Sequence, residues 1–133
     1  MKLEGKTKRR KYIDKNRLKN SFKYALEGIK ETYKKEQNIK IHTIIGILVI
    51  IFGFLLKISY VEWLICLMLI GIVLMAEFFN TAIECVVDLI SPKIHPLAKA
   101  AKDIASSAVL IMALISGIIG LLIFIPKICN FIF

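Results

Sequence analysis

Acidic residues are scarce in this chain of 133 residues, which holds 10 Asp and Glu against 19 Lys and Arg. The three Cys form no CxxC pair, which argues against a disulfide framework and a structural zinc site, and their apolar neighbours predict buried thiols. The chain also lacks the GxxxxGKS/T loop, the HRD and DFG motifs, a GxGxxG turn, an HExxH motif and a Ser-His-Asp arrangement. If it handles phosphate groups, it therefore does so without a soluble kinase fold.

Hydrophobic residues, by contrast, make up 57% of the chain, whereas soluble domains hold about 45–50%. They form three long runs, at residues 41–58, 62–90 and 104–125, and the third stops at Pro126. Each run can supply the roughly 20 mainly apolar residues that a spanning helix needs. The sequence therefore predicts an all-α integral membrane protein with three transmembrane helices, forming a single domain over residues 1–133.

The net charge of +9 lies entirely ahead of the first hydrophobic run, because the later residues carry equal numbers of acids and bases. Such a basic segment could bind nucleic acid. Because hydrophobic sequence follows it directly, we instead expect attraction to anionic membrane lipids and no nucleic-acid partner. The loop at residues 91–103 is also basic, so the positive-inside rule predicts a cytoplasmic N-terminus and an outward-facing C-terminus.

Residues 15–35 show the periodicity of an amphipathic helix. Lysines lie off the apolar stripe of this helix. The stripe itself recurs at spacings of three and four residues and consists of Leu18, Phe22, Ala25, Ile29 and Tyr33. A basic amphipathic helix of this kind lies in the membrane plane, although a soluble helix docked on the bundle would show the same stripe. Residues 1–14 have no periodicity and are expected to form a flexible basic tail.

The second hydrophobic run contains acids after 14 uncharged residues, Trp63 to Ala76. At about 100° per residue, five polar residues fall within an arc of about 100°: Glu77, Asn80, Thr81, Glu84 and Asp88. Acids near the bilayer centre cost at least ~2.5–3.5 kcal/mol each. We therefore expect a cation to offset the repulsion between the acids of this stripe, and we expect the stripe to be functional. The alternative is that Glu84 and Asp88 simply emerge into the cytoplasmic headgroups.

Glu77 and Glu84 lie about 10.5 Å apart along the helix axis, too far to share one small ion directly. Glu36, ahead of the first run, is expected at the depth of Glu84. These two carboxylates are candidate ligands for a hard cation such as Mg²⁺, which would leave Glu77 free for proton chemistry. His42 is better suited to an interfacial hydrogen bond than to metal binding. Lys102, at the entrance of the third run, offers a point charge suited to phosphate.

Two motifs carry a family resemblance. Glu77-Phe-Phe-Asn80-Thr81-Ala-Ile-Glu84-Cys-Val-Val-Asp88 and Ala101-Lys102-Asp103-Ile-Ala-Ser106-Ser-Ala-Val109 resemble the prokaryotic diacylglycerol kinase family, which includes the undecaprenol kinases of Gram-positive bacteria. The resemblance covers about Arg17 to Ile125, and Asn38 and His42 look more like the undecaprenol kinase branch. It implies a small three-span lipid kinase of the bacterial cell membrane, with an amphipathic surface helix, working as a homotrimer.

The resemblance also implies roles for single residues. Glu77 matches the proposed general base that takes the lipid hydroxyl proton, and Glu36 and Glu84 match the carboxylates that hold Mg²⁺ on the nucleotide. Nucleotide-side positions are Asn80, Asp88, His95, Lys102 and Asp103, surface-helix positions near the phosphates or the lipid head are Arg17 and Tyr24, and a position near the lipid is Ser106.

The function implied is phosphoryl transfer from ATP-Mg²⁺ to a lipid alcohol, with undecaprenol as the favoured acceptor and diacylglycerol as the alternative. Three small helices offer a thin wall for a nucleotide, which favours a site shared between subunits. Asp103 could instead cap the third helix. A cation- or proton-conducting oligomer would also use an acidic stripe and small-residue packing, and a membrane adaptor would need no aligned acids. Transfer of phosphate from ATP to lipid separates the kinase from both.

Overall fold

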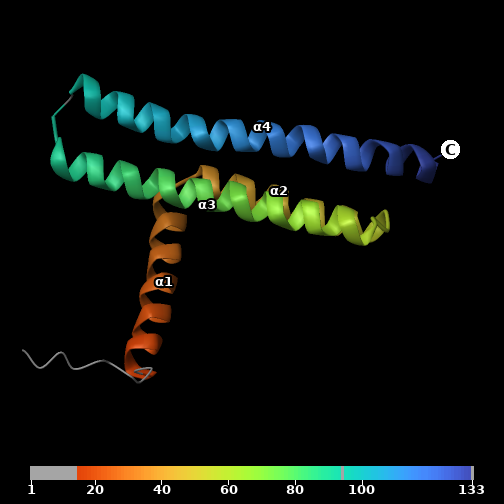
Figure 1. Cartoon of the computed structure of the whole chain (residues 1–133), viewed down its shortest axis with the longest axis horizontal. Coiled ribbons are helices and arrows are strands. Elements are labelled where there is room, and N and C mark those ends of the chain that lie inside the picture. The colour runs from red at the N-terminus through yellow and green to blue at the C-terminus, as the bar shows by residue number, and fades with distance from the viewer. Residues whose placement is uncertain (1–14, 94, 133) are drawn as a thin grey trace, which may run out of the picture. The chain divides into compact units, whose positions relative to one another are not determined.

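The structure is a computed structural model, and it describes residues 15–93 and 95–132. These residues form four helices, α1 (Lys15–Lys35), α2 (Asn38–Leu55), α3 (Tyr60–Ile90) and α4 (Pro96–Ile132) (Figure 1). The predicted all-helical fold is thereby confirmed for the described part of the chain. The chain divides into two units, one ending at Glu31 and the other beginning at Thr32.

The first unit, as far as it is described, consists of most of α1. The helix has the bounds that its periodicity predicts, Lys15–Lys35. Within it, the Ser21 hydroxyl donates to the Arg17 carbonyl at 2.9 Å, and Lys23 lies 3.9 Å from Glu27 one turn later. An ion pair with this i to i+4 spacing stabilises a helix by about 0.2–0.5 kcal/mol. The tail predicted at residues 1–14 lies outside the described residues.

The second unit contains three helices that are long and apolar enough to cross a membrane, α2, α3 and α4. In this unit α3 packs against both of the others, with α4 running antiparallel beside it (Figure 1). Few side chains are buried between them, and most large apolar side chains face outward. An outward apolar surface on helices of this length is what a lipid environment requires. The three predicted transmembrane helices are therefore present.

A tight turn joins α2 to α3. Lys57 adopts a left-handed backbone with φ 50°, which ends α2, and the Ile58 amide donates back to the Gly53 carbonyl at 3.1 Å. Ser59 and Glu62 then form a capping box that starts α3. Gly53 is needed at the base of this turn, because a Cβ there would lie 2.8 Å from the Trp63 ring. The turn ends α2 at Leu55, earlier than the predicted residue 58.

The third spanning helix differs most from its predicted bounds, residues 104–125. It starts at Pro96, because proline fits the first helical position and the His95 Nδ1 accepts the Leu97 amide as a cap. It also continues through Pro126 to Ile132, so the predicted stop there was wrong. Spanning helices tolerate proline, and Lys127 beyond it reaches the Glu62 carboxylate on α3 at 3.2 Å.

The cysteines also differ from expectation. Cys66 is buried, but Cys85 and Cys129 are exposed. Both lie among apolar neighbours in the sequence, so an apolar sequence context does not by itself predict burial in a protein core here. The same reasoning applies to most of the hydrophobic residues of this unit.

Candidate active site

Glu77 is the most deeply buried acid of the described chain, with 1% of its surface exposed. Its nearest polar neighbour is on α2, where the His42 Nε2 lies 3.3 Å from Oε1. The pair is within ion-pair distance but is not aligned as a hydrogen bond, and neither Glu77 oxygen has a hydrogen-bond partner among the described residues. Buried polar groups are nearly always satisfied. An unsatisfied buried carboxylate is therefore a candidate functional group.

The polar stripe of α3 continues from Glu77 toward the end of the helix. Asn80 and Thr81 are buried, and the Thr81 hydroxyl donates to the Glu77 carbonyl at 3.0 Å. The Asn80 amide donates to the Glu84 Oε1 at 3.1 Å, which leaves the Asn80 Oδ1 buried without a partner in the described chain. The structure thus places these polar side chains on one face of α3, as the spacing predicts.

Glu36 lies between α1 and α2 and is partly buried. It and Glu84 both act electrostatically on Glu77, so three acids share this region. Next to them, the Lys35 ammonium donates to the Cys85 sulfur at 3.2 Å. This hydrogen bond favours the charged ammonium and raises the pKa of Lys35 above its ordinary value. A cation is therefore held near the acids at the end of α1.

The junction of α3 and α4 forms a second polar region. A cavity of about 270 Å³ lies here, and its charged or titratable lining residues are Asp88, Lys93, His95, Lys99 and Lys102. The Lys102 ammonium lies 2.6 Å from the Asp88 carboxylate and so ties α4 to α3. Lys99 and Asp103 form an ion pair one turn apart on α4. The cavity therefore combines several cations with acids, which suits a polyanionic ligand.

Three further residues are implied by the resemblance. Arg17 and Tyr24 belong to the first unit and lie on α1. Ser106 is exposed on α4. The site that the second unit assembles contains Glu36, Glu77, Asn80 and Glu84, with a neighbouring set at the start of α4.

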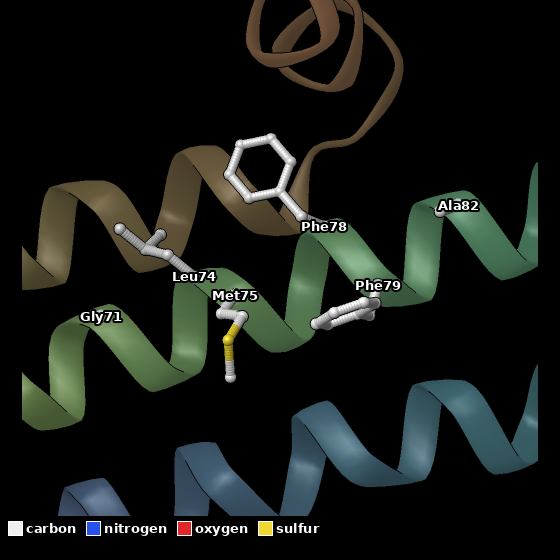
Figure 2. Close-up of a pocket in the computed structure, with 6 residues that line it drawn as sticks. All are labelled: Gly71, Leu74, Met75, Phe78, Phe79 and Ala82. Atoms are coloured by element: carbon white, nitrogen blue, oxygen red, sulfur yellow. The ribbon is translucent and has the colours of Figure 1, made fainter. Parts of the chain in front are cut away.

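An open apolar hollow of about 510 Å³ lies along α3, on a different face of the helix from the polar stripe. Its lining residues come from α3 alone: Gly71, Leu74, Met75, Phe78, Phe79 and Ala82 (Figure 2). Figure 2 shows the Phe78 and Phe79 rings leaving the helix in different directions. Because Phe78 directly follows Glu77 in sequence, one helix presents an acid and a large apolar surface at the same depth.

The His42 contact is the part of the site that sequence reasoning missed. No Lys or Arg stands near Glu77 in the sequence, and its partner comes from a helix 35 positions earlier. The available signal was a histidine within an otherwise apolar run, at the start of the first spanning helix. Such a polar residue in a membrane segment usually faces the bundle interior.

Comparison with known proteins agrees with this geometry. The sequence model of the family described as prokaryotic diacylglycerol kinase matches residues 23–124. A Bacillus subtilis protein named undecaprenol kinase is 53% identical over 112 residues, covering 84% of this chain and 91% of that protein. The protein named diacylglycerol kinase from Haemophilus influenzae is 34% identical over 109 residues, covering 80% and 92%. That from Synechocystis is 35% identical over 111 residues, covering 83% and 63%. A buried acid on a membrane-spanning helix, a charged cavity at the α3–α4 junction and these relatives lead to one conclusion, that the chain belongs to the prokaryotic diacylglycerol kinase family of bacterial membrane lipid kinases.

Proposed function

We propose that this lipid kinase transfers the γ-phosphate of ATP to undecaprenol, giving undecaprenyl phosphate, with Glu77 as the general base. The observation that carries the proposal is the Glu77 carboxylate itself, buried and without a hydrogen-bond partner among the described residues. The choice of acceptor is supported by the relative named undecaprenol kinase, at 53% identity. Diacylglycerol is the alternative acceptor, because other relatives carry that name at 34–35% identity.

The chemistry needs one proton transfer and one exchange of bonds at phosphorus. Glu77 takes the proton of the lipid hydroxyl as its oxygen bonds to the γ-phosphorus, and the bond from that phosphorus to the bridging oxygen breaks, releasing ADP. General-base help of this kind typically contributes 10²–10⁴-fold. The rest of the catalysis is positioning and charge stabilisation.

Glu36 and Glu84 would hold Mg²⁺ on the nucleotide. The donor set fits this ion, because it consists of carboxylate oxygens and the unpartnered Asn80 Oδ1 lies beside Glu84. No cluster of three or more His, Cys, Asp or Glu side chains that could hold a metal occurs in residues 15–93 and 95–132. Mg²⁺ in phosphoryl-transfer sites usually takes only one or two carboxylates, with substrate phosphates and waters completing its shell. When bound, the ion would neutralise charge on the phosphates.

The cavity at the α3–α4 junction would hold the rest of the nucleotide. Lys102 supplies a positive charge there, held by Asp88. We assign three more residues to nucleotide binding. They are His95 and Asp103 at this junction and Asn80 on the polar stripe of α3. We assign Arg17 and Tyr24 to the phosphates or the lipid head and Ser106 to the lipid, following the family resemblance.

The proposed assembly is a homotrimer with active sites shared between subunits. Its physical support is the large outward apolar surface of the second unit and the small number of buried side chains. We further propose that α1 lies in the plane of the inner leaflet, that the N-terminus is cytoplasmic and that the C-terminus faces out. The basic segment and the basic 91–103 loop support this orientation. The whole chain, residues 1–133, would form one membrane-embedded kinase domain.

The direct test is a phosphoryl-transfer assay on the purified protein. ATP labelled in the γ-phosphate is supplied with Mg²⁺ and either undecaprenol or diacylglycerol, presented in matched detergent micelles. We expect label in lipid with both, and a higher kcat/KM with undecaprenol. A higher value for diacylglycerol would reassign the acceptor, and label in neither lipid would refute the proposed reaction.

A further inference from the structure

The α2 helix brings one titratable side chain to Glu77. The His42 Nε2 lies 3.3 Å from the Glu77 Oε1, while the Oε2 of the same carboxylate has no partner among the described residues. The two oxygens therefore stand in different surroundings. The side chain of His42 is 19% exposed and that of Glu77 is 1% exposed. His42 thus lies between the buried acid and the outside of the bundle.

The other titratable groups acting on Glu77 in the described chain are Glu36, from the segment before α2, and Glu84, on α3 itself. Both are acids, so neither ionised carboxylate can donate a hydrogen bond to Glu77. Their negative charges push the Glu77 carboxylate away from them. Of these three neighbours, His42 is the one that can fix the position of Glu77 by donating an N–H.

His42 is itself held in place by its helix. One turn earlier on the same helix, Ile39 is fully buried. The next residue, Thr43, hydrogen-bonds both the Tyr33 hydroxyl and the Ile39 carbonyl. One turn later, Gly46 lets α2 approach Ile70 of α3, since a Cβ there would lie 3.1 Å from that side chain. The imidazole is therefore presented to Glu77 by a well-anchored part of α2.

We propose that His42 is a positioning residue, which holds the Glu77 carboxylate by Oε1 so that Oε2 is directed to the acceptor hydroxyl. The inference rests on the proposed role of Glu77 as general base. In catalysis, the imidazole would need only a short movement to turn its 3.3 Å contact into an aligned hydrogen bond. It would then restrict the carboxylate to one rotamer and stabilise its charged form before the proton is taken.

The test uses two substitutions of His42 in the full-length protein. His42→Leu removes the donor, and we expect kcat to fall on the order of 10²-fold, the effect of a misplacement of about 1 Å in an active site. The KM for ATP should stay within about threefold, because His42 is not among the proposed nucleotide or Mg²⁺ residues. His42→Gln keeps an N–H at a similar distance from the backbone, so it should recover most of the lost kcat. Ile45→Val, a substitution of an exposed side chain on α2, is the control.

A second measurement separates this role from a structural one. If His42 acts through Glu77, His42→Leu should lower turnover little further in a Glu77→Gln background. Full additivity of the two effects would overturn the proposal, and so would an unchanged kcat in His42→Leu. Equal losses in His42→Leu and His42→Gln would overturn it as well. If His42→Leu does not fold, His42→Asn replaces it. The Asn side chain is polar, but its amide is one bond too short to reach the Glu77 carboxylate.

The outcomes also separate this inference from the proposed function. If Glu77→Gln alone keeps wild-type turnover, the general-base assignment fails, whatever His42 does. If Glu77→Gln is inactive and His42→Leu is fully active, only the positioning role fails. In both arms the readout is label transferred from ATP to undecaprenol, with diacylglycerol as the second acceptor.

Discussion

Replacing Glu77 by Gln is the sharpest test of the site. The substitution removes the proton acceptor and keeps the shape of the side chain. Since a general base contributes about 10²–10⁴-fold, the loss corresponds to about 2.7–5.4 kcal/mol of transition-state stabilisation. We expect kcat to fall by at least the lower factor.

The same substitution should leave folding intact. Glu77 is 1% exposed and neither of its oxygens accepts a hydrogen bond from a described residue. The contact with His42 at 3.3 Å is weakened, but removing a buried charge relieves a larger desolvation cost. The stability of Glu77→Gln in detergent, measured by its melting temperature, should equal or exceed that of the wild type.

The assay measures ATP-Mg²⁺ binding and turnover in one Glu77→Gln preparation. We expect unchanged nucleotide affinity together with lost turnover, because Glu77 is assigned to the acceptor hydroxyl rather than to the metal. Lost nucleotide binding would instead make Glu77 a ligand. Retained turnover would make it a structural residue and refute the reasoning from its burial.

Three further predictions concern orientation, metal and packing. Cysteines engineered into the 91–99 loop should react with impermeant reagents only after cells are opened; labelling from outside intact cells would refute the proposed topology. Glu36→Gln and Glu84→Gln should each raise the Mg²⁺ concentration needed for half-maximal activity, and wild-type activity of both at limiting Mg²⁺ would contradict the ligand assignment. Gly53→Ala should lower the melting temperature in detergent, since its Cβ would meet the Trp63 ring at 2.8 Å and overpacking costs about 1–3 kcal/mol. Gly71→Ala, where a Cβ meets nothing within 4 Å, is the matched control.

Hydropathy and periodicity predict the helices well where these signals coincide with the helix ends. The bounds of α1 agree at both ends, because its apolar stripe and its lysines occupy the whole helix. The start of α4 was missed by eight residues, since residues 96–103 are helical but include three charged side chains. Hydropathy reports where a helix enters lipid, whereas His95 and Pro96 determine where it begins.

The site was predictable along one helix and not between helices. Helical geometry alone places Glu77, Asn80 and Glu84 on one face, and the structure agrees. Contacts such as His42 with Glu77 and Lys102 with Asp88 depend on how neighbouring helices are aligned. That alignment follows from turn geometry and from close contacts at glycines, which the hydrophobic pattern does not encode.

The short turn between α2 and α3 has a consequence for how the length of this chain can vary. Residues 56–59 fix how far along α3 the partner of any α2 residue lies, since α2 ends and α3 begins at this turn. One residue inserted into α3 between the turn and Glu77 would rotate that carboxylate about the helix axis by about 100° and move it along the axis by about 1.5 Å. An insertion of three or four residues would restore its direction but shift it by a full helical turn away from His42. The number of residues between this turn and Glu77 is therefore constrained. Substitutions in this part of the chain should be tolerated far more easily than insertions or deletions.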